Sequence, residues 1–425
     1  MFSLLGQRRF GPLFATQFLG AFNDNLFKTA MLFLIIYHLL GNDLRGGATM
    51  VTAAAGVFIL PFFLFSGIAG QLADAVDKAA VARGVKLAEI AILGVGALAL
   101  AAQSIPLLFA VLFGMGTHST LFGPVKYAIL PQHLRPAELL AGTGLVEGGT
   151  FVAILLGQIA GGLLPTPWTG AVMLVVAVAG AATSRFIPAA PPISAGTTGR
   201  RIDWNPLRAS RTVIAQSLTL RPVLYATIAI SWFWALGAVF TSQFVPLVKG
   251  SLHASEPVAT LFLATFTIGI AAGSVAASRL VGGRVSARAA PWGAVAMAVA
   301  SIDLMLAIDH GVAGHAVAVP AMAMTPVGLA AYLATPAAWR VLADLLVLSA
   351  AGGIFSVPLY AILQTAGGAE TRAGAVAANN IVNAAFQVGG TLMAGSAVGA
   401  GVPVPIVLAA GGASALLLIP MVRRL

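Results

Sequence analysis

The first long apolar stretch of the chain, residues 10–37, carries ionisable side chains near its centre. It is long enough to cross a bilayer, because about 20 predominantly apolar residues suffice. Asp24 and Lys28 lie near its middle, where a charged group costs roughly 2.5–3.5 kcal/mol on insertion scales. Residues four apart share one helical face, and this face must turn to protein or to a water-filled cavity. We therefore expect the rest of the chain to enclose a polar centre.

The overall composition is that of a polytopic membrane protein. The chain is 59% hydrophobic and 8% charged, with a mean hydropathy of +0.95, whereas soluble proteins carry about 25% charged residues. The net charge of +10 does not indicate nucleic acid, because the basic residues occur in short loops between apolar runs, where they set topology. The chain has no cysteine, which excludes disulfides, thiolate metal sites and cysteine nucleophiles. No cleavable signal peptide is visible.

The apolar runs predict an all-α fold with twelve membrane-spanning helices. They lie at 11–40, 49–72, 85–103, 106–130, 138–164, 168–187, 222–248, 256–280, 289–309, 339–365, 372–399 and 402–421. Residues 188–221 begin with a proline-rich run and carry Arg200, Arg201, Arg208 and Arg211. We therefore expect a cytoplasmic linker between a six-helix bundle at 1–187 and a second at 222–425. The segment 311–338 is interrupted by three prolines, and we expect it to be an insertion on the outer face.

The distribution of Lys and Arg predicts the orientation. With the N-terminus in the cytoplasm, only Arg45, Lys249 and Arg340 fall on or near the outer side. The residues that fall inside are Arg8, Arg9, Lys78, Arg83, Lys86, Arg135, the linker arginines, Arg279, Arg284, Arg288, Arg372, Arg423 and Arg424. This bias predicts that both termini are cytoplasmic.

The two halves resemble each other in sequence. Residues 122–130 align with residues 355–363, and Ala141-Gly142 aligns with Ala373-Gly374. Repeats of this kind build many transporters, which bind substrate at the repeat interface. The alignment places Trp234 opposite Asn23 and Leu359 opposite Lys126. We therefore expect polar chemistry in the first half and an aromatic, apolar surface in the second.

The polar residues of the first span allow two interpretations. Asp24 and Lys28 either neutralise each other and hold the span in its bundle, or they meet a zwitterionic or anionic headgroup. Asn23 and Asn25 flank the acid and offer neutral hydrogen-bonding groups, which favours the second interpretation.

Other spans contribute further candidates. Lys126 either snorkels to the interface or serves as a compact point charge for a phosphate. Glu147, which lies among glycines in the fifth span, pairs with Lys126 or Lys28, titrates as a coupling group, or is purely structural. Asn379 and Asn383 in the eleventh span either line a cavity or support polar helix packing.

The loop between the second and third spans has the pattern of a glycine, acids and basic residues. Its members are Gly70, Asp74, Asp77, Lys78 and Arg83. The pattern resembles the cytoplasmic loop signature of the major facilitator superfamily, with Asp77 where that signature has a glycine. An acid at a helix terminus that pairs with basic residues would latch one conformation; the alternative is an ordinary charged loop. The copy in the second half, from Gly273 to Arg284, is degraded.

Three strings of residues, at 16–28, 70–74 and 123–132, resemble the bacterial lysophospholipid transporters of LplT type within the major facilitator superfamily. The resemblance implies alternating-access movement of lysophosphatidylethanolamine and lysophosphatidylglycerol from the outer to the cytoplasmic leaflet of the inner membrane. It implies a monomer without a cofactor, and a functional link to a cytoplasmic acyltransferase/acyl-carrier-protein synthetase. The family pattern carries a binding role onto Asn23, Asp24, Asn25, Lys28, Lys126, Tyr127 and Glu147, and we add Trp234, Asn379 and Asn383 from the second half.

The sequence leaves two other functions open. Gly148, Gly157 and Gly161 partly resemble the fifth-span motif of drug–proton antiporters, although Gly162 stands where that motif has a proline; this alternative is a cation-coupled exporter of amphiphilic drugs. The third class is a membrane anchor for the acyltransferase. No hydrolytic constellation or metal-ligating cluster appears in the sequence, so we do not expect an enzyme.

Overall fold

The computed structural model describes residues 1–39, 44–192, 202–316, 326–366 and 372–425. Within these ranges the regular structure is helical, apart from an isolated bridge between Ala254 and Val327. The predicted all-α fold is therefore confirmed over the described part of the chain.

The helices of the first half follow one another with short connections. They are α1 (Gly11–Phe33), which continues as a π-helix (Leu34–Leu39), α2 (Leu44–Ala75), α3 (Lys78–Ala101), α4 (Ile105–His133), α5 (Pro136–Leu163) and α6 (Thr166–Ser184). A proline in the first turn begins α4, α5 and α6, where its missing N–H leaves no helical hydrogen bond unmade.

The second half repeats this pattern after a shorter helix, α7 (Pro206–Ser217). Its helices are α8 (Arg221–Pro246), α9 (Glu256–Leu280), α10 (Ala290–Ala316), the short α11 (Leu329–Leu333), α12 (Pro336–Ala366), α13 (Arg372–Gly399), and α14 (Val404–Ala413), which continues through a 3-10 turn into α15 (Ile419–Val422). Eleven described helices are long and apolar enough to cross a membrane, and α6, with its apolar run Trp168–Ser184, is shorter. With α6 included, the helices match the twelve predicted spans.

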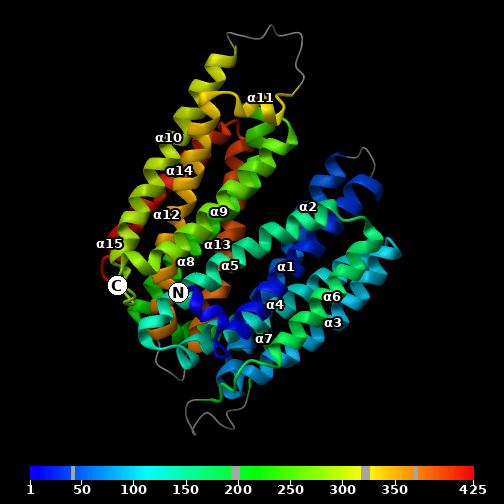
Figure 1. Ribbon diagram of the computed structural model, residues 1–425, viewed down its shortest axis with the longest axis vertical. Helices are drawn as coiled ribbons and strands as arrows, with labels where there is room; N and C mark the ends of the chain where they lie inside the picture. Colours follow the sequence, from blue (N-terminus) through cyan, green and yellow to red (C-terminus); the bar gives the residue numbers. More distant parts are fainter. Residues whose placement is uncertain (40–43, 193–201, 317–325, 367–371) are drawn as a thin grey trace.

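The helices pack in two groups, one for each half of the chain. In the first half, α1 packs on α5 and α6, and α3 packs on α4 and α6; in the second, α12 packs on α9 and α10, and α8 packs on α13. Figure 1 shows α1, α3, α4 and α6 on one side and α8 to α14 on the other. The two sides touch mainly where α5 meets α9 and where α2 meets α13.

The helix α7 lies within the predicted linker and packs against both α2 and α13. A Cβ on Gly67 of α2 would lie 2.4 Å from the backbone nitrogen of Ser210 in α7, so the two helices are in close backbone contact. Arg208, in the first turn of α7, binds Asp203 just before the helix, and this hydrogen bond lowers the pKa of the aspartate. We refer below to this end of the molecule as the α7 end. The bundle boundaries at 187/188 and 221/222 stay a prediction.

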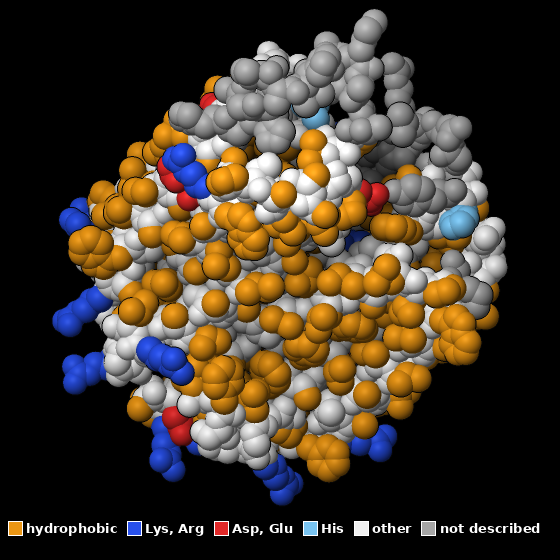
Figure 2. Space-filling view, turned by 45° about the horizontal axis from the view of Figure 1, so that its top comes forward, with side chains coloured by type: hydrophobic (Ala, Val, Ile, Leu, Met, Phe, Trp, Pro, Cys, Tyr) orange, Lys and Arg blue, Asp and Glu red, His pale blue; other side chains and the backbone are white. Residues whose placement is uncertain are grey.

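The surface of the molecule is apolar across its middle. Figure 2 shows hydrophobic side chains covering the centre of one face, with Lys and Arg side chains gathered around its lower and left edges. This distribution is typical of a membrane protein, because apolar side chains face the acyl chains and basic side chains reach the headgroups.

Two predictions need correction. The third span was expected to begin at residue 85, with Lys86 among the basic residues on the cytoplasmic side, but α3 begins at Lys78 and the Lys86 side chain is fully buried. The predicted insertion at 311–338 is shorter, because α10 continues to Ala316 and α12 begins at Pro336. Residues 317–325 lie outside the described ranges, and α11 lies near the top of Figure 1, away from both termini.

Candidate functional site

A cavity of about 470 Å³ lies between the two halves. Residues of α1, α2, α4 and α5 line one side, and residues of α8, α12 and α13 line the other. On α1 the lining runs from Gln17 to Leu32, and on α2 it includes Ala54, Phe58 and Phe62. The cavity therefore extends from the middle of the bundle toward the end opposite α7.

At the α7 end the halves close on each other. A Cβ on Gly144 of α5 would lie 2.4 Å from the carbonyl oxygen of Ser274 in α9. A Cβ on Gly70 of α2 would lie 2.7 Å from the Cβ of Ala377 in α13. Gln364 of α12 also donates a 3.2 Å hydrogen bond to Thr143 of α5. Backbones approach this closely only where small residues meet.

Asp24 and Lys28 both line the cavity, but they are not ion-paired with each other. Asp24 accepts a hydrogen bond from the Ser119 hydroxyl, and its other oxygen, Oδ1, is buried with no hydrogen-bond partner. The Nζ of Lys28 lies 5.5 Å from the centre of the Phe58 ring, and no carboxylate among the described residues lies within 4 Å of it. Mutual neutralisation therefore does not account for these two charges.

Asn23 and Asn25 diverge although both flank Asp24. Asn25 lines the cavity, and its amide donates to the carbonyl of Ala21 at 2.9 Å. Asn23 turns away from the cavity and donates to Glu89 at 3.3 Å and to the carbonyl of Met173 at 3.2 Å. As a substrate contact, Asn23 thus has no support from the geometry.

Lys86, Glu89 and His118 form a buried charge cluster behind α1 that was not predicted from the sequence. Lys86 Nζ lies 2.7 Å from Glu89 Oε2, and His118 Nε2 lies 3.3 Å from the same oxygen. The side chains are 0–2% exposed, while Lys86 and His118 also contribute to the cavity wall. Glu89 and His118 lie inside predicted spans, so a search for every ionisable residue within the spans would have found them.

Lys126 and Tyr127 lie on the cavity wall from α4, and Glu147 lies behind them. Tyr127 donates its hydroxyl hydrogen to Glu147 Oε1. Lys126 Nζ lies 4.8 Å from the centre of the Tyr127 ring, and among the described residues no carboxylate is within 4 Å of it. A direct ion pair of Glu147 with Lys126, one of the alternatives for this residue, is therefore not formed.

Aromatic rings join the two halves at the bottom of the cavity. Tyr127 of α4 stacks on Tyr360 of α12, with ring centroids 5.0 Å apart and planes 11° from parallel. Trp234 of α8 donates from Nε1 to the Tyr360 hydroxyl at 2.6 Å and stacks on Phe151 of α5 at 5.5 Å. Tyr360 was missed, although the alignment of 122–130 with 355–363 places it opposite Tyr127.

The helix α13, which is the predicted eleventh span, contributes amides to the cavity, so the expectation of a purely aromatic, apolar surface in the second half is wrong. Asn383 lines the cavity together with Asn380 and Gln387, and its Oδ1 accepts a 2.6 Å hydrogen bond from Ser231. Asn379 is fully buried and does not line the cavity.

The loop residues predicted as a latch divide into two groups. Asp74 accepts hydrogen bonds from the backbone nitrogens of Ala373 and Gly374, at 3.2 and 3.1 Å, in the first turn of α13. A carboxylate there also interacts favourably with the helix dipole. Gly70 allows the approach, as described above. These two residues therefore connect α2 of the first half to α13 of the second.

The remaining loop residues make no contact of this kind with the described residues of α13. Asp77 caps α3 by accepting from Ala79 N at 2.8 Å, and it accepts from Ala190 N at 3.1 Å. Lys78 is buried and Arg83 is half-buried. In the second half, the position four residues after Gly273 is Ala277, which packs in an apolar cluster with Leu140 and Val357, so this side has no counterpart of Asp74.

No group of three or more His, Cys, Asp or Glu side chains suited to a metal ion occurs within the described ranges. The charged residues that line the cavity are instead one aspartate, Asp24, and three lysines, Lys28, Lys86 and Lys126, all from the first half.

Comparison with known proteins gives consistent matches over most of the chain. The family model described as Major Facilitator Superfamily matches residues 13–391. The protein named lysophospholipid transporter LplT from Serratia proteamaculans (strain 568) is 30% identical over 380 residues, which is 86% of this chain and 82% of that protein. The protein of the same name from Escherichia coli O1:K1 / APEC is 28% identical over 376 residues, with the same shares covered.

Solved structures share the fold at low sequence identity. The human organic anion transporter MFSD10 has a TM-score of 0.73 and 13% identity, with 97% of this chain and 99% of that chain covered. The transporter FucP in its outward conformation has a TM-score of 0.70 and 11% identity, with 97% of each chain covered.

Proposed function

Because the chain belongs to the LplT-type transporters of the major facilitator superfamily, we propose that it moves lysophospholipids across the bacterial inner membrane. The observation that carries the proposal is a cavity lined both by charged side chains, Asp24, Lys28 and Lys126, and by apolar and aromatic ones, among them those of α2 and Trp234 of α8. A lysophospholipid has the matching division into a charged headgroup and a single apolar chain.

The headgroup would bind along α1 and α4. Lys28 and Lys126 are cations without a carboxylate within 4 Å among the described residues, and a lysine ammonium is a compact charge suited to phosphate. Asp24 Oδ1 is a buried acceptor with no partner, and such a group costs free energy until a donor reaches it. An ethanolamine ammonium or a glycerol hydroxyl would supply that donor. We therefore propose lysophosphatidylethanolamine and lysophosphatidylglycerol as substrates.

The acyl chain would occupy the apolar part of the same cavity. Phe58, Ile59 and Phe62 of α2 face this space, and Trp234 lines it from the second half. Burial of each methylene contributes about 0.8 kcal/mol, so this wall would add substantially to the affinity for a long-chain lipid.

Movement to the cytoplasmic leaflet requires the closed α7 end to open. The Asp74 contacts with α13 and the close approach of Gly144 to α9 would break, while the opposite end closes, as in alternating access between pseudo-symmetric halves. The proposed direction is inward, so that a cytoplasmic acyltransferase/acyl-carrier-protein synthetase can use the product. We propose that the transporter works as a monomer with both termini in the cytoplasm.

Translocation by the purified protein in proteoliposomes tests the proposal. Labelled lysophosphatidylethanolamine is added to the outer leaflet, and the fraction protected from extraction by albumin is followed over time, with and without proton or sodium gradients. Replacing Lys126 with Ala should slow translocation by roughly tenfold or more, since a hydrogen bond to a charged group contributes about 1.5–3 kcal/mol. Lys249→Ala is the matched control, because Lys249 is exposed and does not line the cavity.

The outcomes separate the three functions. Protection by the wild-type protein alone rules out a mere membrane anchor. Equal rates for Lys126→Ala and wild type, at equal protein levels, contradict the proposed site. If instead a deletion strain is sensitive to amphiphilic drugs while its lysophospholipid uptake is normal, the protein is a drug exporter.

A further inference from the structure

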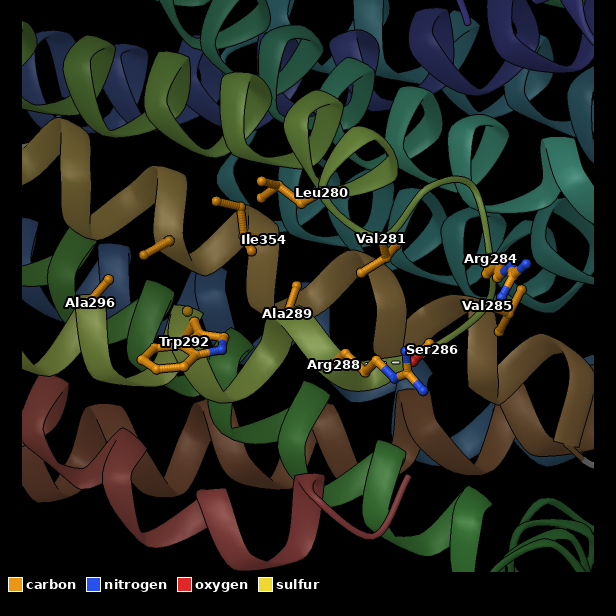
Figure 3. A pocket seen from close by; sticks show the side chains of 12 residues that line it. Leu280, Val281, Arg284, Val285, Ser286, Arg288, Ala289, Trp292, Ala296 and Ile354 are labelled. Carbon is orange, nitrogen blue, oxygen red and sulfur yellow. Dashed lines mark hydrogen bonds between the residues drawn. The ribbon is translucent and has the colours of Figure 1, made fainter.

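A groove separate from the central cavity lies at the α7 end of the second half. It has a volume of about 720 Å³ and runs between α9, α10 and α12. Figure 3 shows Arg284, Ser286 and Arg288 at one end of this groove and Trp292, Ala296 and Ile354 toward the other. One end is therefore cationic and the remainder is apolar.

The cations of this groove have no protein counter-charge. Arg284 and Arg288 are exposed, and among the described residues no carboxylate lies within 4 Å of either guanidinium. The residues that line the groove include no Asp or Glu. Guanidinium groups bind phosphate through two parallel hydrogen bonds, so an anionic phosphodiester fits here, whereas the ammonium of a zwitterionic headgroup would find no partner.

The face of α10 beside the groove is apolar and exposed. Trp292 is 76% exposed, and Val295 and Val299, further along α10, are 37% and 62% exposed. Tryptophan is enriched at the membrane–water interface, so this position places the arginines at headgroup level and the valines among acyl chains.

A second groove, of about 500 Å³, shares Ser286, Arg288 and Trp292 with the first and is completed by Ile419, Val422 and Arg423. Trp292 therefore separates two apolar grooves that meet at Arg288. A lipid with two acyl chains has the matching shape, with one chain for each groove and the phosphate above the ridge.

We propose that this pair of grooves binds an anionic diacyl phospholipid of the leaflet at the α7 end. Its phosphodiester lies between Arg284 and Arg288, and its chains lie on either side of Trp292. The positive charge in the loops of this end predicts that the leaflet is the cytoplasmic one, where basic pockets between helices hold anionic headgroups. The inference does not depend on the transported substrate, because the grooves lie outside the central cavity.

The position of the grooves gives the bound lipid a structural role. The connection from α9 to α10 is the counterpart of the loop that holds Asp74, and Ala277 stands where Asp74 would be. The lipid phosphate supplies a negative charge to this connection, whose residues 281–289 include no Asp or Glu. Its chains cover grooves beside α10, which packs on α12. Binding should therefore stabilise the fold.

Lipid binding to the purified full-length protein tests the proposal. Native mass spectrometry counts bound phosphatidylglycerol against phosphatidylethanolamine of the same chains, and thermal unfolding in detergent reports the stabilisation by each lipid. The double variant R284Q/R288Q should bind phosphatidylglycerol roughly 20- to 30-fold more weakly, since each basic residue contributes about 1 kcal/mol near anionic lipid. R185Q/R211Q is the control, because it removes the same charge from exposed arginines elsewhere.

A third variant keeps both arginines and fills the groove. Ala296→Phe places a ring beside Trp292 and should weaken binding of the diacyl lipid while lysophospholipid translocation continues. The proposal stands if phosphatidylglycerol binds and stabilises selectively and the groove variants lose this effect while the control keeps it. It is overturned if the wild type shows no preference for phosphatidylglycerol, or if the groove variants bind it as tightly as the control does.

Discussion

Tyr127 and Tyr360 occupy equivalent positions in the two sequence repeats, and they stack on each other across the interface with ring centroids 5.0 Å apart. Tyr127 also donates to Glu147, and Tyr360 accepts from Trp234 at 2.6 Å. The stack therefore joins the first half to the second at the cavity. It lies between the cavity and the closed α7 end, so it must separate when that end opens.

Replacing Tyr360 with Ala should favour the state that is open at the α7 end. A stacked aromatic pair contributes about 0.5–1.5 kcal/mol beyond its buried area. Tyr360→Phe keeps the stack and removes only the hydroxyl, which accepts from Trp234. The chain contains no cysteine, so one introduced cysteine reports opening without background. Ser274→Cys suits this purpose, because the Ser274 side chain is fully buried and its hydroxyl has no hydrogen-bond partner. Maleimide should label it faster in Tyr360→Ala than in Tyr360→Phe; equal rates would contradict a gating role for the stack.

Asp74 and Asp77 should respond differently to the same substitution. Asp74→Asn removes the charge that faces the first turn of α13 and should weaken the closed end by about 0.3–2 kcal/mol. Asp77→Asn keeps a side chain that caps α3 equally well, because Asn and Asp are comparable N-caps. In the Ser274→Cys background, we expect faster labelling for Asp74→Asn and unchanged labelling for Asp77→Asn. A reversed order would show that the contact with α13 does not hold the closed state.

Gly70 should tolerate no side chain, whereas Gly84 should. A methyl group on Gly70 would lie 2.7 Å from the Cβ of Ala377, and one on Gly84 would meet nothing within 4 Å. Gly70→Ala should therefore force α2 and α13 apart at a cost of about 1–3 kcal/mol. Gly84→Ala should be neutral or stabilise α3 by up to about 1 kcal/mol. Thermal unfolding in detergent measures both, and equal midpoints would refute the close packing of α2 on α13.

Glu89 should matter far more for stability than an exposed acid does. Glu89→Gln leaves the Lys86 ammonium buried without its counter-charge, and breaking a buried pair in this way costs about 3–5 kcal/mol. Asp203→Asn breaks the pair with Arg208, whose side chain is 73% exposed, and such surface pairs contribute about 0–1 kcal/mol. Unfolding midpoints should fall markedly for the first variant and little for the second. A stable Glu89→Gln protein would mean that water or another acceptor reaches Lys86.

Much of the candidate site could be predicted from the sequence, because polar residues within an apolar run are easy to identify. Asp24, Lys28 and Lys126 were predicted in this way, and the structure brings them to one cavity. Asn23 was predicted by the same rule and lies on the other side of α1. Neighbouring residues on a helix point about 100° apart, and the sequence does not show which direction faces the cavity.

The sequence by itself determined the membrane class, the all-α fold and the number of spans, since each apolar run signals a helix through its own length and composition. It also placed charge in the first span, where only a polar environment tolerates it. The tertiary structure decided which of those charges face the cavity, that Lys86 is buried beside Glu89, and that Tyr127 meets Tyr360. These features depend on contacts between helices that are far apart in the chain. The composition and periodicity of a single segment therefore cannot predict them.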